Sequence, residues 1–509
     1  MKRVQVTLAV LLVALAAFTS TSSSSAAPAA ARTALLGVPS HPKDLTYHDL
    51  KFEVPDANKY RFKLKNGIVA YVAEDHALPL VTVTVLVRAG SFLEPADKIG
   101  LASITGSMMR DGGTEKMSAE EFDEKVDFLA ADISSFVGDT QGGASLNCLS
   151  SVLDPSLDLF FDMMRSPRFQ QSRLEVEKGN RLEDMKQRND DAGRILGREW
   201  RWLMYGETHF ASRQSTNKNV DAITRDDLVE FHRKYWRPEN MILAIGGDVN
   251  AKEVLASLDR RFAGWKTQGP AVPWPPPAPS FAPKAGLYHV EKDIPQGKVY
   301  IGHLGTKWDR WDNPDNFALM VMNDILGGGG FTSRITKKVR SDEGLAYSAG
   351  SRFGIETYWP GDFRVSYQSK NPTVALAAKY SIAEIKRLRE EPVTEEELTT
   401  SKNSFIDTFP RSFESPARVA RLFADDDYIG RPHAYWQAYR DNIRKVTAAE
   451  VQRVAKTYLS PDKLVFIVVG KWSEIESGDA DKRASMAEFY GGQVAHIPLR
   501  DPLTLKPMQ

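Results

Sequence analysis

Several residue types and motifs that mark common classes of protein are scarce or missing in this sequence. Its 509 residues include one cysteine, Cys148, so neither an intrachain disulfide nor a cysteine-rich zinc module can form. The 66 Lys and Arg residues balance 66 Asp and Glu residues, and zero net charge excludes the basic field of a general nucleic-acid binder. The chain has no G-x-S-x-G elbow, no phosphate-binding loop and no H-E-x-x-H motif. Since 42% of the residues are hydrophobic and 26% are charged, the composition is that of an ordinary globular protein.

The first apolar run is too short to cross a bilayer as a stable helix. Lys2 and Arg3 precede the apolar residues 8–18, and a Ser/Ala-rich stretch follows to about residue 31. This order is typical of a secretory signal peptide, with an uncleaved anchor as the alternative. We therefore expect residues 1–31 to be removed and the mature protein to be exported to a bacterial periplasm, with no membrane span.

An internal repeat divides the mature chain at a proline-rich stretch. Seven prolines fall between Pro270 and Pro283, which favours an extended linker. On either side a capped helix, a Pro turn and an apolar strand recur at an offset of 223 residues: Thr224, Tyr235, Pro238 and Gly247 match Thr447, Tyr458, Pro461 and Gly470. The predicted parts are an N-terminal half (46–268), a linker (269–285), a C-terminal half (286–475) and a tail (476–509).

Local patterns predict an α+β fold in each half. Asn66-Gly67 is typical of a tight hairpin turn between strands at 60–64 and 68–72, and residues 81–87 form a buried-strand pattern. Helical periodicity covers residues 119–129 and 174–188. We expect two homologous α/β-roll halves, each a sheet with helices packed on one face.

An ordered set of motifs over residues 62–471 resembles the insulinase/pitrilysin family of inverzincin metallopeptidases. The similarity is greatest to its bacterial two-half members and to mitochondrial processing peptidase, and it implies a clamshell of such halves. The motifs are Leu64-Lys-Asn-Gly67, Ala89-Gly-Ser91 with Glu94, Gly100-Leu-Ala102, Phe231-His232, Tyr235-Trp-Arg-Pro-Glu-Asn240, Ile245-Gly-Gly-Asp248, Ile325-Leu-Gly-Gly-Gly-Gly-Phe-Thr-Ser-Arg334 and Val339-Arg-Ser-Asp-Glu-Gly-Leu-Ala-Tyr347.

The resemblance also implies a zinc site that this chain has lost. In active members Gly-Leu-Ala is followed by H-x-x-E-H, whose histidines bind zinc and whose Glu is the general base. Here Ser103 and Ser107 stand at the ligand positions and Gly106 at the base position. The third ligand position falls on Asp184, seven residues after Glu177. Neutral hydroxyls cannot replace imidazole for Zn²⁺, so we expect no metal or cofactor on this chain and no catalysis by it alone.

The C-terminal half keeps residues that active members use on the substrate. Arg340 and Tyr347 have the spacing of the family's Arg/Tyr pair, which implies a grip on the peptide carbonyl and on a developing oxyanion. The alternative is that Arg340 forms a surface ion pair and Tyr347 packs in the core. Gly328, Gly329 and Gly330 belong to a glycine loop after an apolar helix at 317–326, and either approach the substrate closely or end that helix.

These observations favour a half-enzyme. We expect a zinc-free subunit that supplies Arg340 and Tyr347 to a zinc-bearing homologous partner, in a heterodimeric metalloendopeptidase acting on peptides or unfolded polypeptides. A peptide-binding or scaffold protein of the same fold is the alternative from another class. An autonomous metallopeptidase with unusual ligands is disfavoured, because two serines cannot hold zinc.

Overall fold

The computed structural model describes residues 39, 41, 44–46, 51–265, 271–277 and 281–508. The chain divides into two units, Met1–Glu53 and Val54–Gln509, and the second holds the two sheets. The predicted signal peptide lies outside the described residues, as does part of the predicted linker. Among the described residues, no helix combines the length and apolarity that a bilayer crossing requires.

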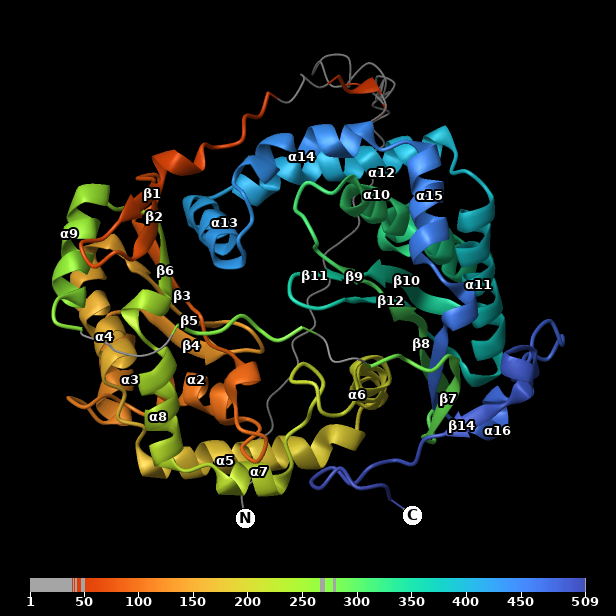
Figure 1. Cartoon of the computed structure of the whole chain (residues 1–509), viewed down its shortest axis with the longest axis horizontal. Helices are drawn as coiled ribbons and strands as arrows, with labels where there is room; N and C mark the ends of the chain where they lie inside the picture. Colours follow the sequence, from red (N-terminus) through yellow and green to blue (C-terminus); the bar gives the residue numbers. More distant parts are fainter. Residues whose placement is uncertain are drawn as a thin grey trace, which may run out of the picture. The chain divides into compact units, whose positions relative to one another are not determined.

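Two six-stranded mixed sheets organise the second unit (Figure 1). The first has the order β1-β2-β6-β3-β5-β4 and the second the order β10-β12-β8-β13-β7-β14. The strands of the first sheet are β1 (Arg61–Lys63), β2 (Val69–Glu74), β3 (Leu80–Val87), β4 (Asp132–Val137), β5 (Gly142–Leu149) and β6 (Met241–Gly247). Those of the second are β7 (Gly286–Glu291), β8 (Gln296–Leu304), β10 (Ala346–Phe353), β12 (Asp362–Lys370), β13 (Val465–Gly470) and β14 (Val494–His496). A small parallel pair, β9 (Thr306–Lys307) and β11 (Ile355–Glu356), stands apart.

Five strands in each sheet follow the same topology. Counted along the chain within each half, the order in space is first, fifth, second, fourth, third. The first and fifth strands are parallel (β2 with β6, β7 with β13), and all other neighbours among these five are antiparallel. The capping boxes Thr224/Asp227 and Thr447/Glu450 begin matching helices before the fifth strand of each half. This shared topology supports the internal repeat.

The helices of the two halves lie in groups between these strands. The first half contains α2 (Leu101–Asp111), α3 (Ala119–Phe128), α4 (Leu153–Arg165), α5 (Gln171–Lys186), α6 (Ala192–Tyr205), α7 (Asn217–Ala222), α8 (Arg225–Tyr235) and α9 (Ala251–Phe262). The second contains α10 (Pro314–Asn323), α11 (Val374–Glu390), α12 (Glu395–Thr408), α13 (Pro416–Ile429), α14 (Ala434–Lys445), α15 (Ala448–Tyr458) and α16 (Trp472–Ile475). The predicted hairpin, the predicted strand and both predicted helices are therefore present, within a few residues of their expected bounds.

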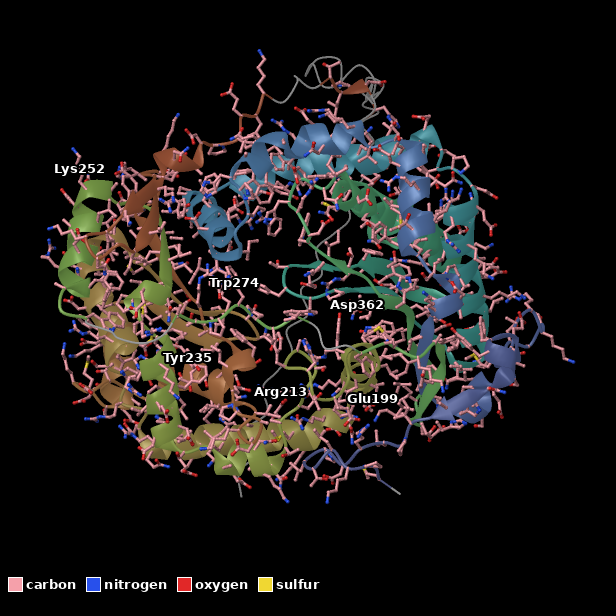
Figure 2. The ribbon with its side chains drawn as sticks, in the orientation of Figure 1. Glu199, Arg213, Tyr235, Lys252, Trp274 and Asp362 are labelled. Atoms are coloured by element: carbon pink, nitrogen blue, oxygen red, sulfur yellow. The ribbon has the colours of Figure 1, made fainter. Side chains whose placement is uncertain are left out.

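One helix from each half packs on the sheet of the other half. Trp200 of α6 donates from Nε1 to Asp362 on β12 (2.6 Å), and its ring meets Tyr300 of β8 edge-on. In return, Tyr428 of α13 donates to the carbonyl oxygen of Thr140 (2.7 Å), and Phe423 of α13 contacts Tyr71 of β2. Figure 1 shows α13 beside the first sheet, and Figure 2 labels Asp362. Thus α6 of the first half packs on the second sheet, and α13 of the second half packs on the first sheet; we call this the helix exchange.

The exchanged helices cover sheet faces that the expected fold leaves bare. In β3, Val81, Val83 and Val85 point into the core shared with α2 and α4, while Thr82 lines a hollow with α13 residues. In the second sheet, Ile467 and Val469 of β13 pack against Ile195 and Trp200 of α6. The expectation of helices on one face therefore needs an extension, because each sheet also carries a helix from the other half on its second face.

The C-terminal tail packs onto its own chain. Its strand β14 extends the second sheet in parallel to β7. Farther on, Arg500 forms an ion pair with Glu207 (2.7 Å), and the carbonyl oxygen of Leu503 accepts from the N–H of Asn217 in the first half (2.9 Å). The tail therefore links the second sheet to helices of the first half.

Substituting Gly246 tests the packing of α13 on β6. A Cβ atom there would lie 2.5 Å from Ala417 Cα and 2.6 Å from the Pro416 carbonyl carbon, both backbone atoms of α13. We expect Gly246→Ala to lower the free energy of unfolding by about 1–3 kcal/mol, measured by urea titration. Gly197→Ala in α6 is the matched control, because its Cβ would meet nothing within 4 Å and should leave stability unchanged or raise it by up to ~1 kcal/mol. Equal stability of the two variants would contradict the close packing.

Candidate functional site

Glu94 anchors the start of α2, the helix that carries Ser103, Gly106 and Ser107. Gly100 precedes the helix in the left-handed region (φ 106°), and no side chain of its own caps the helix. Instead, the Glu94 carboxylate accepts from the N–H groups of Gly100 (3.2 Å) and Ala102 (2.7 Å). Arg213, labelled in Figure 2, forms an ion pair with the same carboxylate (3.1 Å). Burial raises the pKa of Glu94, while these donors and Arg213 oppose that rise.

A hydrogen-bonded network joins α2 to α5 at Ser103 and Ser107, where the resemblance described above implies zinc ligands. Arg181 of α5 donates from Nη1 to Ser103 Oγ (3.0 Å) and from Nε to Glu177 Oε1 (2.8 Å). Ser107 Oγ donates to the same Glu177 oxygen (3.1 Å). The Arg181 and Glu177 side chains are 30% and 21% exposed. A guanidinium and a carboxylate therefore bridge the two serines.

Asp184 does not join this network. It accepts from Arg194 Nη1 (2.9 Å), and its side chain is 66% exposed. Asp184 lies on the same helix stripe as Glu177 and Arg181 by its spacing. It is two turns beyond Glu177, and its carboxylate pairs with Arg194 of α6 and not with the serines of α2. The acid that the structure brings to the serines is thus Glu177.

Gly106, where the resemblance implies a general base, packs against the backbone of β4. A Cβ atom there would lie 2.6 Å from the Phe136 carbonyl carbon and closer still to the Val137 nitrogen. Ser135 Oγ of the same strand donates to the Gly106 carbonyl oxygen (2.7 Å). A glutamate side chain has no room at this position unless α2 and β4 separate.

These residues do not fit a zinc ion. The network offers two neutral hydroxyls, one carboxylate and a permanent cation, whereas zinc sites use imidazole, thiolate and carboxylate ligands. Arg181 would also repel a divalent cation held by its neighbours. Across the described ranges, no three His, Cys, Asp or Glu side chains gather closely enough to bind a metal.

The glycine loop of the second half lies between two π-helical segments. α10 runs into a π-helix at Asp324–Gly328, and a second one at Thr336–Asp342 carries Arg340. A Cβ atom on Gly327 would lie 2.6 Å from Ser351 Oγ on β10, so this glycine allows close packing. Gly328 and Gly329 lie against Asn323 and Asp324, whereas Gly330 has φ +63° and open space around its Cβ position. π-Helical turns are frequent at functional sites.

The guanidinium of Arg340 lies over two exposed aromatic rings. Its guanidinium carbon lies 4.3 Å from the centre of the Phe331 ring and 4.8 Å from that of Tyr347. Tyr347 is 86% exposed and Phe331 is 65% exposed. Within the described residues Arg340 forms no ion pair, so the geometry is neither a surface ion pair nor a core tyrosine. Tyr347 lies on β10, an edge strand of the second sheet.

Two residues of these groups escaped the sequence analysis. Arg181 follows Glu177 by four residues, a spacing visible in the sequence but typical of any exposed helical ion pair. Phe331 lies inside the glycine-loop motif, and its aromatic side chain was the available signal. Among the described residues, no hydrogen bond or ion pair joins the Ser103–Arg181 network to the Arg340–Tyr347 pair.

Comparisons with known proteins point to one family. The profile described as "Insulinase (Peptidase family M16)" matches residues 69–202, and "Peptidase M16 inactive domain" matches residues 222–405. A curated relative from Helicobacter pylori, "Non-peptidase homolog YmxG", is 23% identical over 78% of this chain and 90% of its own length. Other curated relatives are named uncharacterized zinc proteases, among them proteins of Rickettsia bellii and Mycobacterium leprae.

Solved structures share the fold. A peptidase M16 inactive domain from Pseudomonas fluorescens is 23% identical with a TM-score of 0.71, covering 81% of this chain and 97% of that one. The periplasmic protease PqqL from Escherichia coli is 13% identical with a TM-score of 0.67, and the match covers 84% of this chain but 49% of PqqL. Two lengths of the present fold would thus fit within that longer chain.

Gly106→Ala tests whether the base position is closed by packing. Because the added Cβ would press on the backbone of β4, we expect the free energy of unfolding to fall by about 1–3 kcal/mol in urea titrations. Gly179→Ala in α5 is the control, since its Cβ would meet nothing within 4 Å and the helix should gain up to ~1 kcal/mol. Unchanged stability of Gly106→Ala would show that α2 and β4 have room for a larger side chain.

Proposed function

Because the chain belongs to the insulinase (M16) family of peptidases, we propose that it serves peptide hydrolysis without holding zinc itself. In this proposal it is the zinc-free subunit of an exported heterodimeric metalloendopeptidase, and a homologous partner carries the zinc. The observation that carries the proposal is the Arg340–Tyr347 pair, which is presented on the surface rather than used in the core.

The chemistry of the pair suits a peptide near the reaction centre. A guanidinium and a phenol hydroxyl both donate hydrogen bonds, and together they can hold a peptide carbonyl as negative charge develops on its oxygen. Stacking between Phe331 and Tyr347 holds the plane of Arg340, so less conformational freedom is lost on binding. The open space beside Gly330 leaves room for a backbone to approach.

The size of the chain supports a two-chain enzyme. Its match to PqqL covers about half of that protease, so two chains of the present size correspond to one such molecule. Since Arg181 and Gly106 leave neither a ligand set nor a base position on this chain, the other chain would have to supply both.

Export is supported by the N-terminal sequence. Lys2 and Arg3, the apolar run 8–18 and the small residues after it form the pattern of a signal peptide. PqqL, which shares the fold, is a periplasmic protease, so export of this chain would place it in the same compartment as that relative.

A non-catalytic peptide-binding or scaffold role is the second candidate. The name of the Helicobacter pylori relative, a non-peptidase homolog, favours it, as does the closed packing at Gly106. Such a protein would hold peptides or partner chains without hydrolysing them.

Native mass spectrometry of the protein recovered from its own host distinguishes the two candidates. The half-enzyme predicts a one-to-one complex with a zinc-bearing homologue that hydrolyses peptides and loses activity to a chelator. A metal-free monomer or homodimer, recovered at low salt and high concentration, would contradict the half-enzyme and favour the scaffold.

Substitution of the pair tests its role within the complex. We expect Arg340→Ala and Tyr347→Phe to lower kcat/KM of the assembled peptidase by about 10–100-fold, because each removes a donor to the substrate. Arg352→Ala is the matched control, because this arginine lies on the same strand with 59% of its side chain exposed and pairs with Glu356. The mass spectrum should show intact complexes for all three variants. Turnover equal to the unmodified complex in both pair variants would refute the assigned role.

A further inference from the structure

A hollow of about 500 Å³ lies between β3 and the helices α13 and α14. Thr82 and Thr84 of β3 form its floor, on the sheet face opposite the core. Arg418, Arg421 and Arg431 line it from the helical side, and Leu422 and Trp436 supply apolar walls. Nothing in the assigned site or in the family resemblance uses these residues.

Arg431 is fixed in place before any ligand arrives. Its Nε donates to Asp426 Oδ1 (2.6 Å), and the other oxygen of Asp426 accepts from Trp436 Nε1 (2.7 Å). The guanidinium carbon lies 4.5 Å from the centre of the Trp436 ring. Burial raises the pKa of Asp426 to about 6, while Arg431 and Trp436 oppose the rise. The hydrogen bonds from Arg431 and Trp436 occupy both oxygens of this carboxylate. Among the described residues, the two terminal nitrogens of Arg431 have no hydrogen-bond partner.

The other two arginines also keep donors for a ligand. Arg421 donates from Nε to Asp425 (2.9 Å) and makes a long contact from Nη2 to Gln141 (3.5 Å). Arg418 forms an ion pair from Nη1 to Glu414 (2.9 Å). Each guanidinium thus has one carboxylate partner among Glu414, Asp425 and Asp426, so net charge alone does not select a ligand. The ligand is selected by the remaining N–H groups and the threonine hydroxyls, because these donors suit the paired oxygens of a carboxylate.

We propose that this hollow binds the C-terminal carboxylate of a peptide whose last side chain is apolar. The carboxylate meets the free N–H groups of the three arginines that line the hollow, Arg418, Arg421 and Arg431. The terminal side chain lies against Leu422 and Trp436. The inference rests on the peptide-binding role proposed above and adds the end of the peptide that the chain recognises. A pocket that binds a C-terminal carboxylate favours short peptides over internal segments of long polypeptides.

Fluorescence anisotropy of a labelled peptide tests the proposal on the full chain without any partner. The probe is an N-terminally labelled short peptide ending in phenylalanine with a free carboxylate. Two comparison peptides carry a C-terminal amide, and one of these also has Glu as its last residue. We expect the free acid to bind at least about tenfold more tightly than the phenylalanine amide, because the amide loses a charge-assisted pair of hydrogen bonds.

Substitutions identify the pocket as the site of binding. Arg421→Gln and Arg418→Gln should each weaken the binding of the free-acid peptide by about tenfold. Neither substitution should change the affinity for the phenylalanine amide. Arg444→Gln on α14 is the control, because this arginine is 52% exposed and pairs with Asp441 away from the hollow. Circular dichroism confirms that each variant is folded.

The outcomes separate this inference from the proposed function. Equal affinity for acid and amide, or no effect of either arginine variant, overturns the carboxylate pocket whether or not a zinc-bearing partner exists. If the Glu amide binds as tightly as the free acid, the pocket reads any carboxylate and the terminal assignment is wrong. The free-acid peptide could bind tightly and depend on the arginines while native mass spectrometry finds no partner. That combination supports the carboxylate pocket and contradicts only the half-enzyme.

Discussion

The reciprocal exchange of α6 and α13 is the packing on which the rest of this structure depends. Each sheet buries one face with helices of its own half and needs a helix of the other half to cover the second face. Trp200 with Asp362 and Tyr428 with Thr140 join apolar packing to a hydrogen bond at each exchange. Because a sheet face left in water would expose apolar residues such as Ile467 and Val469, neither half is complete alone. The hollow between β3 and the helices α13 and α14 exists for the same reason, since β3 forms its floor and α13 one of its walls.

The α2–α5 contact shows how hydrogen bonds join these two helices in a region where the family resemblance implies a zinc site. A zinc ion would cross-link the two helices through coordination bonds; here Arg181 and Glu177 cross-link them through charge-assisted hydrogen bonds to Ser103 and Ser107. The arrangement satisfies polar groups that are only partly exposed and therefore costly to leave unpaired. Gly106 brings β4 close to α2 on the neighbouring helix surface. A zinc site here would therefore require changes at Arg181 and Gly106 as well as two histidines.

The sequence predicted what depends on neighbours along the chain and missed what depends on distant partners. Asn66-Gly67 and the alternating residues around it determine a hairpin locally, and the strand and helix patterns were found within a few residues of β3, α3 and α5. That Ser103, Gly106 and Ser107 share one helix also follows from local sequence, and α2 contains all three. The helix exchange was not predicted, although α6 and α13 begin 224 residues apart, close to the offset of the repeat. Nor was Arg181, because its partner depends on how α5 is rotated against α2.

Stability alone does not account for the Arg340–Tyr347 pair. A tyrosine that is 86% exposed recovers little from burial, and fixing its side chain costs conformational entropy. Arg340 gains two stacking contacts, each worth about 0.5–1 kcal/mol at an exposed position, and lies on a π-helical turn whose hydrogen-bond pattern is rare. By contrast, Glu94, Trp200 and Tyr428 are buried. Their packing and hydrogen bonds offset the conformational entropy that is lost when these side chains are fixed. An ordered, exposed donor pair that contributes little to folding is what a site for an incoming peptide requires, and this physical imbalance distinguishes the pair from the structural residues around it.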